Sequence, residues 1–164
     1  MKHRSLLAGA VLALFAVVLS ACAPNVNLSK ALELTDVLGG YYDEGIRGGK
    51  AWLPPSITFR LHNVSDKTIG PVQLTVAFWQ DGQDGEWNSV LVRAIGSEGL
   101  KPGASTEPLT ARNPNAYTPE GGRQDLFANS GFKDVTAKVF ASQAGNIMKL
   151  GEYKIDRIIL PHLK

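Results

Sequence analysis

The sequence predicts an all-β fold, an antiparallel β-sandwich of about seven strands, behind a cleaved signal helix. Apolar and polar side chains alternate over most of the chain after residue 30, as in strands with one buried face. Turn-forming pairs separate these runs at intervals of about eight to twelve residues, which is typical of sandwiches. A basic start followed by an apolar run over residues 6–19 indicates the signal helix.

The signal segment ends at the only cysteine of the chain. Lys2, His3 and Arg4 precede the apolar run, and small residues lead from it to Cys22. The run has about 14 residues, fewer than the roughly 20 that a membrane-spanning helix needs. We therefore expect a signal peptide over residues 1–21 that is cleaved just before Cys22, with a functional role for the cysteine. The alternatives are a plain signal peptide in which Cys22 is incidental and an uncleaved anchor.

The residues Leu19-Ser20-Ala21-Cys22 resemble the lipobox of bacterial lipoprotein precursors. The resemblance implies that the Cys22 thiol is diacylated, that the chain is cut before Cys22 and that the new amino terminus is acylated as well. The membrane is then a partner through these acyl chains, because two or three chains anchor a protein far more firmly than one. In that family an Asp after the cysteine retains the protein in the inner membrane, so Ala23 favours the outer membrane, facing the periplasm, in a bacterium with two membranes.

The mature chain is neutral and holds one domain. Of the 17 basic residues, Lys2 and Arg4 leave with the signal, so 15 remain against 15 acidic residues. This balance argues against nucleic acid as a partner. One cysteine permits no internal disulfide, so stability must come from an ordinary core. We expect a lipidated tether over residues 22–29 and one sandwich domain over residues 30–164.

The alternation assigns both strands and core. Within the predicted total of about seven strands, the alternation places six, over residues 32–37, 56–65, 72–82, 87–95, 135–142 and 147–160. Within them, six side chains recur on the apolar face and form the predicted core: Phe59, Leu61, Leu74, Val76, Phe78 and Val139.

Turn chemistry supports the same segmentation. Asp81-Gly82, Asp84-Gly85 and Gly145-Asn146 are turn pairs between predicted strands. Only residues 123–129 suit a short helix, because residues 113–122 are rich in Pro, Gly and Asn. About seven strands with this spacing predict a sandwich of immunoglobulin type, without the inter-sheet disulfide of antibody domains.

Part of the chain resembles the small immunoglobulin-like domains of bacterial envelope proteins, including the FxLYD type. The resemblance covers residues 56–109, about a third of the chain, and rests on an Asn-x-Ser strand end, an aromatic pair followed by Asp and Gly, and a Leu-x-Pro-Gly-x-Ser turn. The matching residues are Asn63, Ser65, Val72, Val76, Phe78, Trp79, Asp81, Gly82, Leu100, Pro102, Gly103 and Ser105. A Trp stands where a Tyr is usual, and these motifs imply structure rather than activity. The whole chain also resembles uncharacterised lipoproteins.

Aromatic residues at strand ends and loops are the candidate partner contacts, because aromatic anchors dominate interface energetics. They are Trp79, Trp87, Tyr117, Tyr41 and Tyr42. The segment of residues 41–45 is otherwise expected to be an exposed turn, and residues 79–87 a solvated hairpin tip whose acids could hold at most a weak cation. Adjacent carboxylates at Asp43 and Glu44 do not suit glycoside hydrolysis, which needs two that flank the bond.

The sequence carries no nucleophile–base pair, no metal-spaced ligand set and no phosphate loop, so we expect no enzyme and no cofactor or metal. His62 is expected on the outer face of its strand. Three functions stay open. The first is a lipid-anchored, non-catalytic binding or scaffold module with an envelope protein partner. The others are a subunit of an envelope assembly that docks through a sheet edge and a cell-wall carbohydrate-active enzyme.

Overall fold

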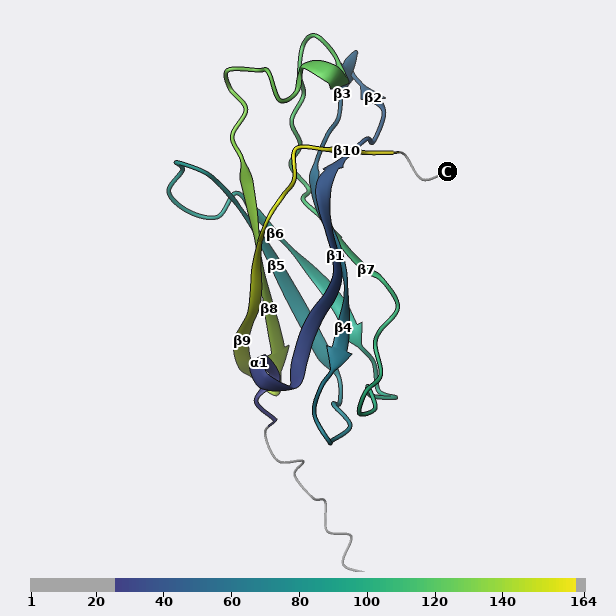
Figure 1. Ribbon diagram of the computed structural model, residues 1–164. Coiled ribbons are helices and arrows are strands. Elements are labelled where there is room, and N and C mark those ends of the chain that lie inside the picture. Colours follow the sequence, from purple (N-terminus) through teal and green to yellow (C-terminus); the bar gives the residue numbers. More distant parts are fainter. Residues whose placement is uncertain (1–25, 162–164) are drawn as a thin grey trace, which may run out of the picture.

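The computed structural model describes residues 26–161, which form a β-sandwich of two four-stranded sheets (Figure 1). The predicted signal peptide over residues 1–21, Cys22 and His162 lie outside the described residues. The first sheet has the order β10 (Ile159–Leu160), β1 (Leu32–Tyr42), β4 (Pro55–Asn63) and β7 (Leu109–Arg112). The second has the order β6 (Asn88–Ile95), β5 (Val72–Gln80), β8 (Val135–Gln143) and β9 (Asn146–Lys154).

This strand order is that of an immunoglobulin-like sandwich. In the first sheet, strands A, B and E of the immunoglobulin fold correspond to β1, β4 and β7. In the second sheet, strands C, C′, F and G correspond to β5, β6, β8 and β9. All neighbours pair antiparallel except β10 with β1. A separate two-stranded ribbon, β2 (Ile46–Arg47) and β3 (Lys50–Ala51), lies between β1 and β4 in the chain. The predicted all-β sandwich is confirmed.

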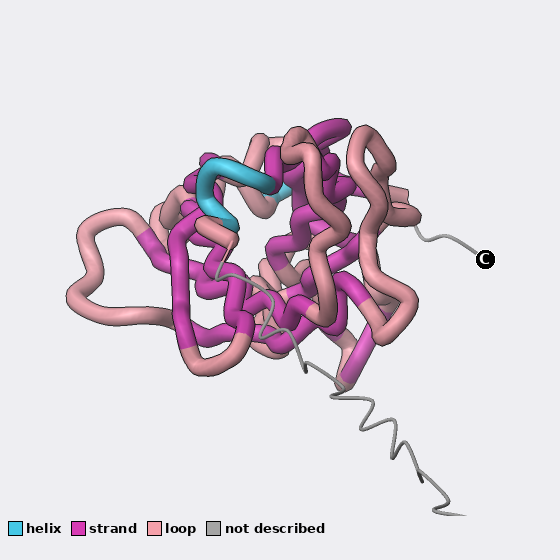
Figure 2. The backbone as a smooth tube through the Cα atoms, turned by 90° about the horizontal axis from the view of Figure 1, so that it is seen from below, coloured by secondary structure: helices cyan, strands magenta, loops and turns pink. Residues whose placement is uncertain are grey.

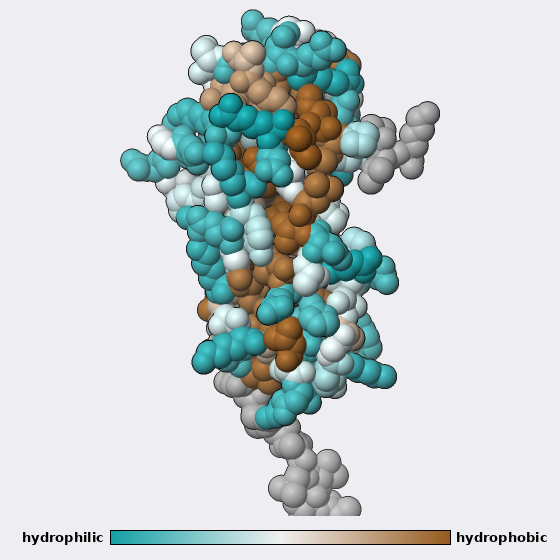
Figure 3. All heavy atoms as spheres, viewed as in Figure 1, coloured by the Kyte–Doolittle hydropathy of each residue, from teal (hydrophilic) through white to brown (hydrophobic). Residues whose placement is uncertain are grey.

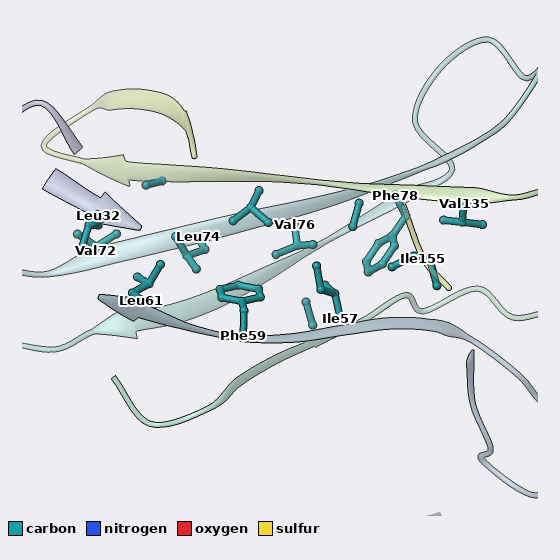
Figure 4. Packing of buried hydrophobic residues seen from close by; sticks show 14 of the residues in the cluster. Leu32, Ile57, Phe59, Leu61, Val72, Leu74, Val76, Phe78, Val135 and Ile155 are labelled. Carbon is teal, nitrogen blue, oxygen red and sulfur yellow. The ribbon is translucent and has the colours of Figure 1, made fainter. Parts of the chain in front are cut away.

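The core lies between the sheets, where alternate side chains of facing strands meet (Figure 4). All six side chains predicted for the core are fully buried: Phe59, Leu61, Leu74, Val76, Phe78 and Val139. Each such side chain contributes about 1.5–3 kcal/mol through removal of apolar surface from water. Period-two alternation was a sufficient guide here because one face of each strand is covered.

The C-terminal segment differs from the prediction of a single antiparallel strand over residues 147–160. The chain leaves β9 at Lys154 and bends at Asp156, where the Ile158 amide donates to the Asp156 carbonyl at 2.8 Å. It then crosses to the other sheet and pairs, as β10, in parallel with the end of β1. Gly40 permits this crossing, because a Cβ there would lie 2.7 Å from Cγ of Leu160.

Two short helices flank the strands. A 3₁₀ turn, Arg123–Asp125, lies in the segment expected to be helical. A helix that the sequence did not predict, α1 (Leu28–Ala31), precedes β1 and buries Leu28 and Ala31 in the core. The predicted tether over residues 22–29 therefore overlaps the folded domain at Leu28. Neither described helix is long and apolar enough to span a bilayer.

The sandwich has two ends, seen in Figure 1 and along the strands in Figure 2. We call one the α1 end; it holds α1 and the connections of residues 64–71, 96–108 and 144–145. The opposite β10 end holds residues 43–54, 81–87, 113–134 and 155–161. Asn63 organises the α1 end, since its buried amide donates to the carbonyls of Lys67 and Leu100, both at 2.8 Å, and accepts from Ser65. The Asn-x-Ser motif is thus structural.

Candidate functional site

An aromatic cluster fills the β10 end. Tyr41, at the end of β1, packs against Tyr117, Phe127 and Phe132, with ring centroids 5.9, 5.4 and 5.5 Å away. Trp87 extends the cluster through Tyr117, at 5.2 Å. These residues come from β1, the connection before β6 and the long connection from β7 to β8, so the loop of residues 113–134 closes this end of the core.

The structure buries the two tyrosines expected in an exposed turn. Tyr41 has no accessible surface, and Tyr42 is 9% exposed. Both belong to β1, and the guanidinium of Arg112 lies 3.5 Å from the ring centroid of Tyr42. The exposed-turn prediction for these two residues is wrong, because Gly39 and Gly40 let β1 continue beneath the C-terminal segment. Tyr41 in this position serves the core and offers no surface to a partner.

The other three candidate aromatics are partly buried. Tyr117 accepts a hydrogen bond from the Gln80 amide and donates one to the Lys133 carbonyl, both at 2.7 Å. Trp87 and Tyr117 both pack against the core. Trp79 lies on the outer face of β5, with the Lys138 ammonium 4.2 Å from its ring centroid. Each residue is partly accessible to solvent, so a contact role for these three stays a prediction.

Burial perturbs the phenol groups of the cluster. Desolvation raises the pKa of Tyr41 far above its usual value, and the phenol of Tyr117 adds to the shift. Desolvation also raises the pKa of Tyr117, although its two hydrogen bonds oppose that shift. Among residues 26–161, the Tyr41 hydroxyl has no hydrogen-bond partner. Both phenols therefore stay neutral at physiological pH.

A hollow of about 240 Å³ opens beside the cluster, lined partly by Tyr117, Leu126 and Phe132. It is smaller than the 300–1,000 Å³ typical of pockets for small organic ligands. No titratable side chain other than Tyr117 lines it. The hollow can hold an apolar side chain of a partner, but it lacks groups for acid–base chemistry.

The acidic pair of the same end is engaged by arginines. Asp43 accepts a hydrogen bond from Arg123, and Glu44 pairs with Arg47 and, at 3.1 Å, with Arg112. These ion pairs fasten the β1–β4 connection to β7 and to the 3₁₀ turn. A general acid for glycoside hydrolysis must be free to give its proton to the leaving group, whereas both of these carboxylates are held by arginine side chains.

Two further carboxylates, Glu98 and Glu107, line a hollow of about 340 Å³ at the α1 end. The Glu107 side chain is 94% exposed and lies 3.8 Å from Arg60, and Glu98 is exposed as well. Neither has the desolvated environment that a general acid requires at neutral pH. The hollow does not supply an acid pair for glycan cleavage.

Asp134 holds the bend between β9 and β10 at the start of β8. Its carboxylate accepts two hydrogen bonds from Arg157, at 2.8 and 2.9 Å, and lies 2.9 Å from Nζ of Lys154. Hydrogen bonds from Arg157 and then Lys154 lower the pKa of Asp134 to about 2. The group is a structural clamp of the β10 end.

The hairpin tip and the histidine follow the sequence expectations. Residues 81–86 are all exposed and project from the sandwich between β5 and β6 (Figure 1). His62 lies on the outer face of β4, where its Nδ1 is 2.9 Å from the Ser105 hydroxyl. Within residues 26–161, no three His, Cys, Asp or Glu side chains gather as a metal site.

An apolar stripe marks one side of the sandwich. Figure 3 shows it along β1 and toward β9, where the two sheets present their edges. On β1, Leu38 is 48% exposed, while Leu34 and Val37 are partly buried against the core, and Ile158, just before β10, is 43% exposed. Within the described residues, β10 pairs with β1 only at Tyr41 and Tyr42, and the C-terminal segment covers Gly39 and Gly40, so the unpaired strand edge runs over residues 33–38. The stripe can accept an extended apolar segment.

A larger hollow, of about 500 Å³, lies at the α1 end and was not anticipated from the sequence. Arg93 of β6, Gln73 of β5 and Ser142 of β8 line it. The sequence feature that could have indicated this hollow is Arg93, the single basic residue in the apolar run of residues 90–95. Its neighbours could not be foreseen, since they come from strands far apart in the chain.

Comparison of the sequence with protein-family models finds no match, and comparison with curated proteins finds none either. The assignment of function therefore depends on the residues and their geometry.

Proposed function

We propose that the protein is a lipid-anchored, non-catalytic binding module of the bacterial cell envelope. Acyl chains on Cys22 hold it to the membrane, in the outer membrane facing the periplasm, and the sandwich meets an envelope protein partner. The observation that carries the proposal is the position of the single cysteine in a lipobox, six residues before the folded domain begins at Leu28.

The placement of α1 supports this arrangement. The residues from Cys22 to Asn27 can span at most about 20 Å, so the α1 end stays close to the membrane. Strands of nine residues extend about 30 Å along the sandwich, which carries the β10 end away from the membrane. The arginine partners of Asp43 and Glu44 support a non-catalytic role, because these carboxylates are engaged in holding the fold together.

Replacement of the cysteine tests the anchor. We expect Cys22→Ser to abolish incorporation of labelled palmitate and to stop maturation, because acylation requires the sulfur. Ser20→Ala is the matched control, since it keeps a small residue at that lipobox position and should be processed normally. Processing and membrane retention of Cys22→Ser equal to those of the unmodified protein would contradict the proposal.

Docking through a sheet edge is a second candidate, favoured by the apolar stripe beside the open edge of β1. A partner strand that pairs with residues 33–38 would extend the strand edge at which β10 is already paired and would cover Leu38. A photo-crosslinking residue at position 38 should then give a discrete adduct in intact cells. The same residue at position 91, where Leu91 is 66% exposed on the other sheet, should not. Equal labelling from both positions would indicate non-specific contact.

A further inference from the structure

The 500 Å³ hollow is built on the outer face of the second sheet, at the α1 end. Gln73 stands opposite Arg93 on one side and opposite Ser142 on the other, so the three side chains form one row across β6, β5 and β8. Ser97 and Gln143, from the adjoining connection and strand end, also line it, over a floor that includes Val72 and Ile95.

Arg93 differs from the other arginines of residues 26–161. Its guanidinium has no ion pair, hydrogen bond or ring contact within these residues. The other five each pair with a carboxylate within 4.0 Å: Arg47, Arg60, Arg112, Arg123 and Arg157. An arginine carries five donors in a fixed planar fork, which suits the oxygens of a carboxylate or a phosphate. Arg93 has these donors free.

The neutral side chains around Arg93 also keep free donors. Gln73, Ser97 and Ser142 make no side-chain hydrogen bond within the described residues. Gln143 is held by a 3.3 Å bond from its amide to the Pro71 carbonyl. The carboxylate of Glu98 lies beside Gly96, a lining residue, but Glu98 is not part of the lining and forms no ion pair with Arg93. The lining thus contains one unpaired cation, several neutral donors and no acid.

We propose that this hollow binds a phosphate group carried by a small polar ligand. Arg93 binds two phosphate oxygens through its fork, and Gln73, Ser97 and Ser142 donate to the remaining oxygens. Four donor side chains outnumber the two oxygens of a carboxylate and suit the tetrahedral phosphate. A volume of about 500 Å³ exceeds what phosphate alone occupies and falls in the range of small-molecule pockets, so the ligand has a body beyond the phosphate.

Two sources can supply this chemistry. One is the headgroup of a phospholipid, which the α1 end reaches if the chain is anchored at Cys22; this source rests on the proposed function. The other is a soluble phosphate ester, which needs no anchor. The titration and the bilayer experiment below separate the two sources.

The titration uses the full mature chain, purified in a nonionic detergent and labelled with ¹⁵N in its arginine side chains. We expect inorganic phosphate and glycerol 1-phosphate to shift the Nε–H signal of Arg93 saturably, while the five paired arginines stay unchanged. Glycerol should have no effect. Absence of a shift at Arg93 with both phosphates, together with no response to anionic bilayers, would overturn the proposal.

Variants test the donor set. We expect Arg93→Gln to weaken phosphate binding at least tenfold and Arg93→Lys to weaken it less, measured by calorimetry. Lys101→Gln is the matched control, because it removes one positive charge from the same end outside the hollow, and it should bind normally. An equal loss of phosphate affinity in Arg93→Gln and Lys101→Gln would show that phosphate responds to the overall positive charge of this end, and it would overturn the proposal. If a variant is unstable, the titration of the Arg93 signal in the unmodified protein still tests the proposal, because it needs no substitution.

The bilayer experiment places the same chain in nanodiscs of phosphatidylcholine alone or with phosphatidylglycerol. A shift at Arg93 only with phosphatidylglycerol assigns the headgroup as the source. A shift with glycerol 1-phosphate but with neither bilayer assigns a soluble ester. The detergent titration does not depend on lipidation, so failure of the Cys22 experiment would leave its result unchanged.

Discussion

The two ends of the sandwich use their polar groups in opposite ways. At the β10 end, Asp43, Glu44 and Asp134 are paired with arginines around an aromatic cluster. At the α1 end, Arg93 lines a hollow and has no partner in the part of the chain that the structure describes. The acidic and aromatic motif that is most conspicuous in the sequence therefore serves stability, while an ordinary strand arginine remains free for a ligand.

Tyr41 should give the largest effect, because it is the central side chain of the aromatic cluster. We expect Tyr41→Ala to lower the free energy of unfolding by about 3–5 kcal/mol, as for other large aromatics removed from a core. Urea denaturation followed by circular dichroism measures it. Tyr41→Phe is the control: no described residue bonds to the Tyr41 hydroxyl, so loss of this group should be neutral or stabilising. A large loss in Tyr41→Phe would show that the hydroxyl is hydrogen-bonded after all.

Tyr117 should show the effect of hydrogen bonds at the same end. Tyr117→Phe removes the donor to the Lys133 carbonyl and the acceptor for the Gln80 amide. We expect a loss of about 1–3 kcal/mol, the cost of leaving such groups unpaired. Tyr153→Phe is matched, because the Tyr153 hydroxyl has no hydrogen bond within the described residues, and it should change stability by less than about 0.5 kcal/mol. Equal losses of stability in the two variants would show that the hydrogen bonds of the Tyr117 hydroxyl do not stabilise the fold.

Asp134 should make stability depend on pH in the acid range. The pKa of about 2 in the folded protein is below the ordinary aspartate pKa of 3.8, so the clamp contributes almost fully above about pH 4. The contribution falls as pH drops through 3.8 toward about 2, where the folded group takes up its proton. We expect the clamp to contribute about 1–2 kcal/mol to the free energy of unfolding near neutral pH. This is less than the pKa difference alone would give, because Lys154 and Arg157 are more than half exposed and water screens the pairs.

Thermal melting between pH 2 and pH 6 measures this dependence. Asp134→Asn should melt earlier near neutral pH and lose less stability on acidification than the unmodified protein. Asp84→Asn, on the exposed hairpin, is the control and should follow the unmodified curve. A pH profile of Asp134→Asn parallel to the unmodified one would assign the acid sensitivity to other groups.

The sequence predicted the sandwich and its core because alternation reports directly which face of a strand is buried. Phe59 and Val139 illustrate this, as both lie on apolar faces and are fully buried. Alternation carries no information on strand partners, so the same pattern over residues 147–160 did not reveal that β10 would leave its sheet and pair with β1. The break depends on a tertiary clamp, the pairing of Arg157 with Asp134.

The candidate sites were harder to predict for a related reason. Tyr41 and Tyr42 follow two glycines, which resemble a turn in the sequence, but these glycines permit close packing of the C-terminal segment. The row of Gln73, Arg93 and Ser142 depends on register between three strands. Register is set by the whole sheet, so no local pattern could bring these residues together.

Arg93 and Arg112 give the smallest expected effect and the sharpest contrast between the two ends. Arg112 pairs with Glu44 and lies over Tyr42, and its Nε is buried. We expect Arg112→Gln to lower the free energy of unfolding by about 1–2 kcal/mol, because Glu44 loses one of its two cations in a partly buried site. Arg93→Gln removes the same charge from an exposed side chain that pairs with no described residue, and it should change stability by less than about 0.5 kcal/mol. Urea denaturation of both variants in phosphate-free buffer compares the arginines directly.

Added phosphate should then stabilise the unmodified protein and Arg112→Gln but not Arg93→Gln, since a ligand raises stability only when it binds the folded state. A loss in Arg93→Gln as large as that in Arg112→Gln would mean that Arg93 supports the fold, and the contrast between the ends would be lost.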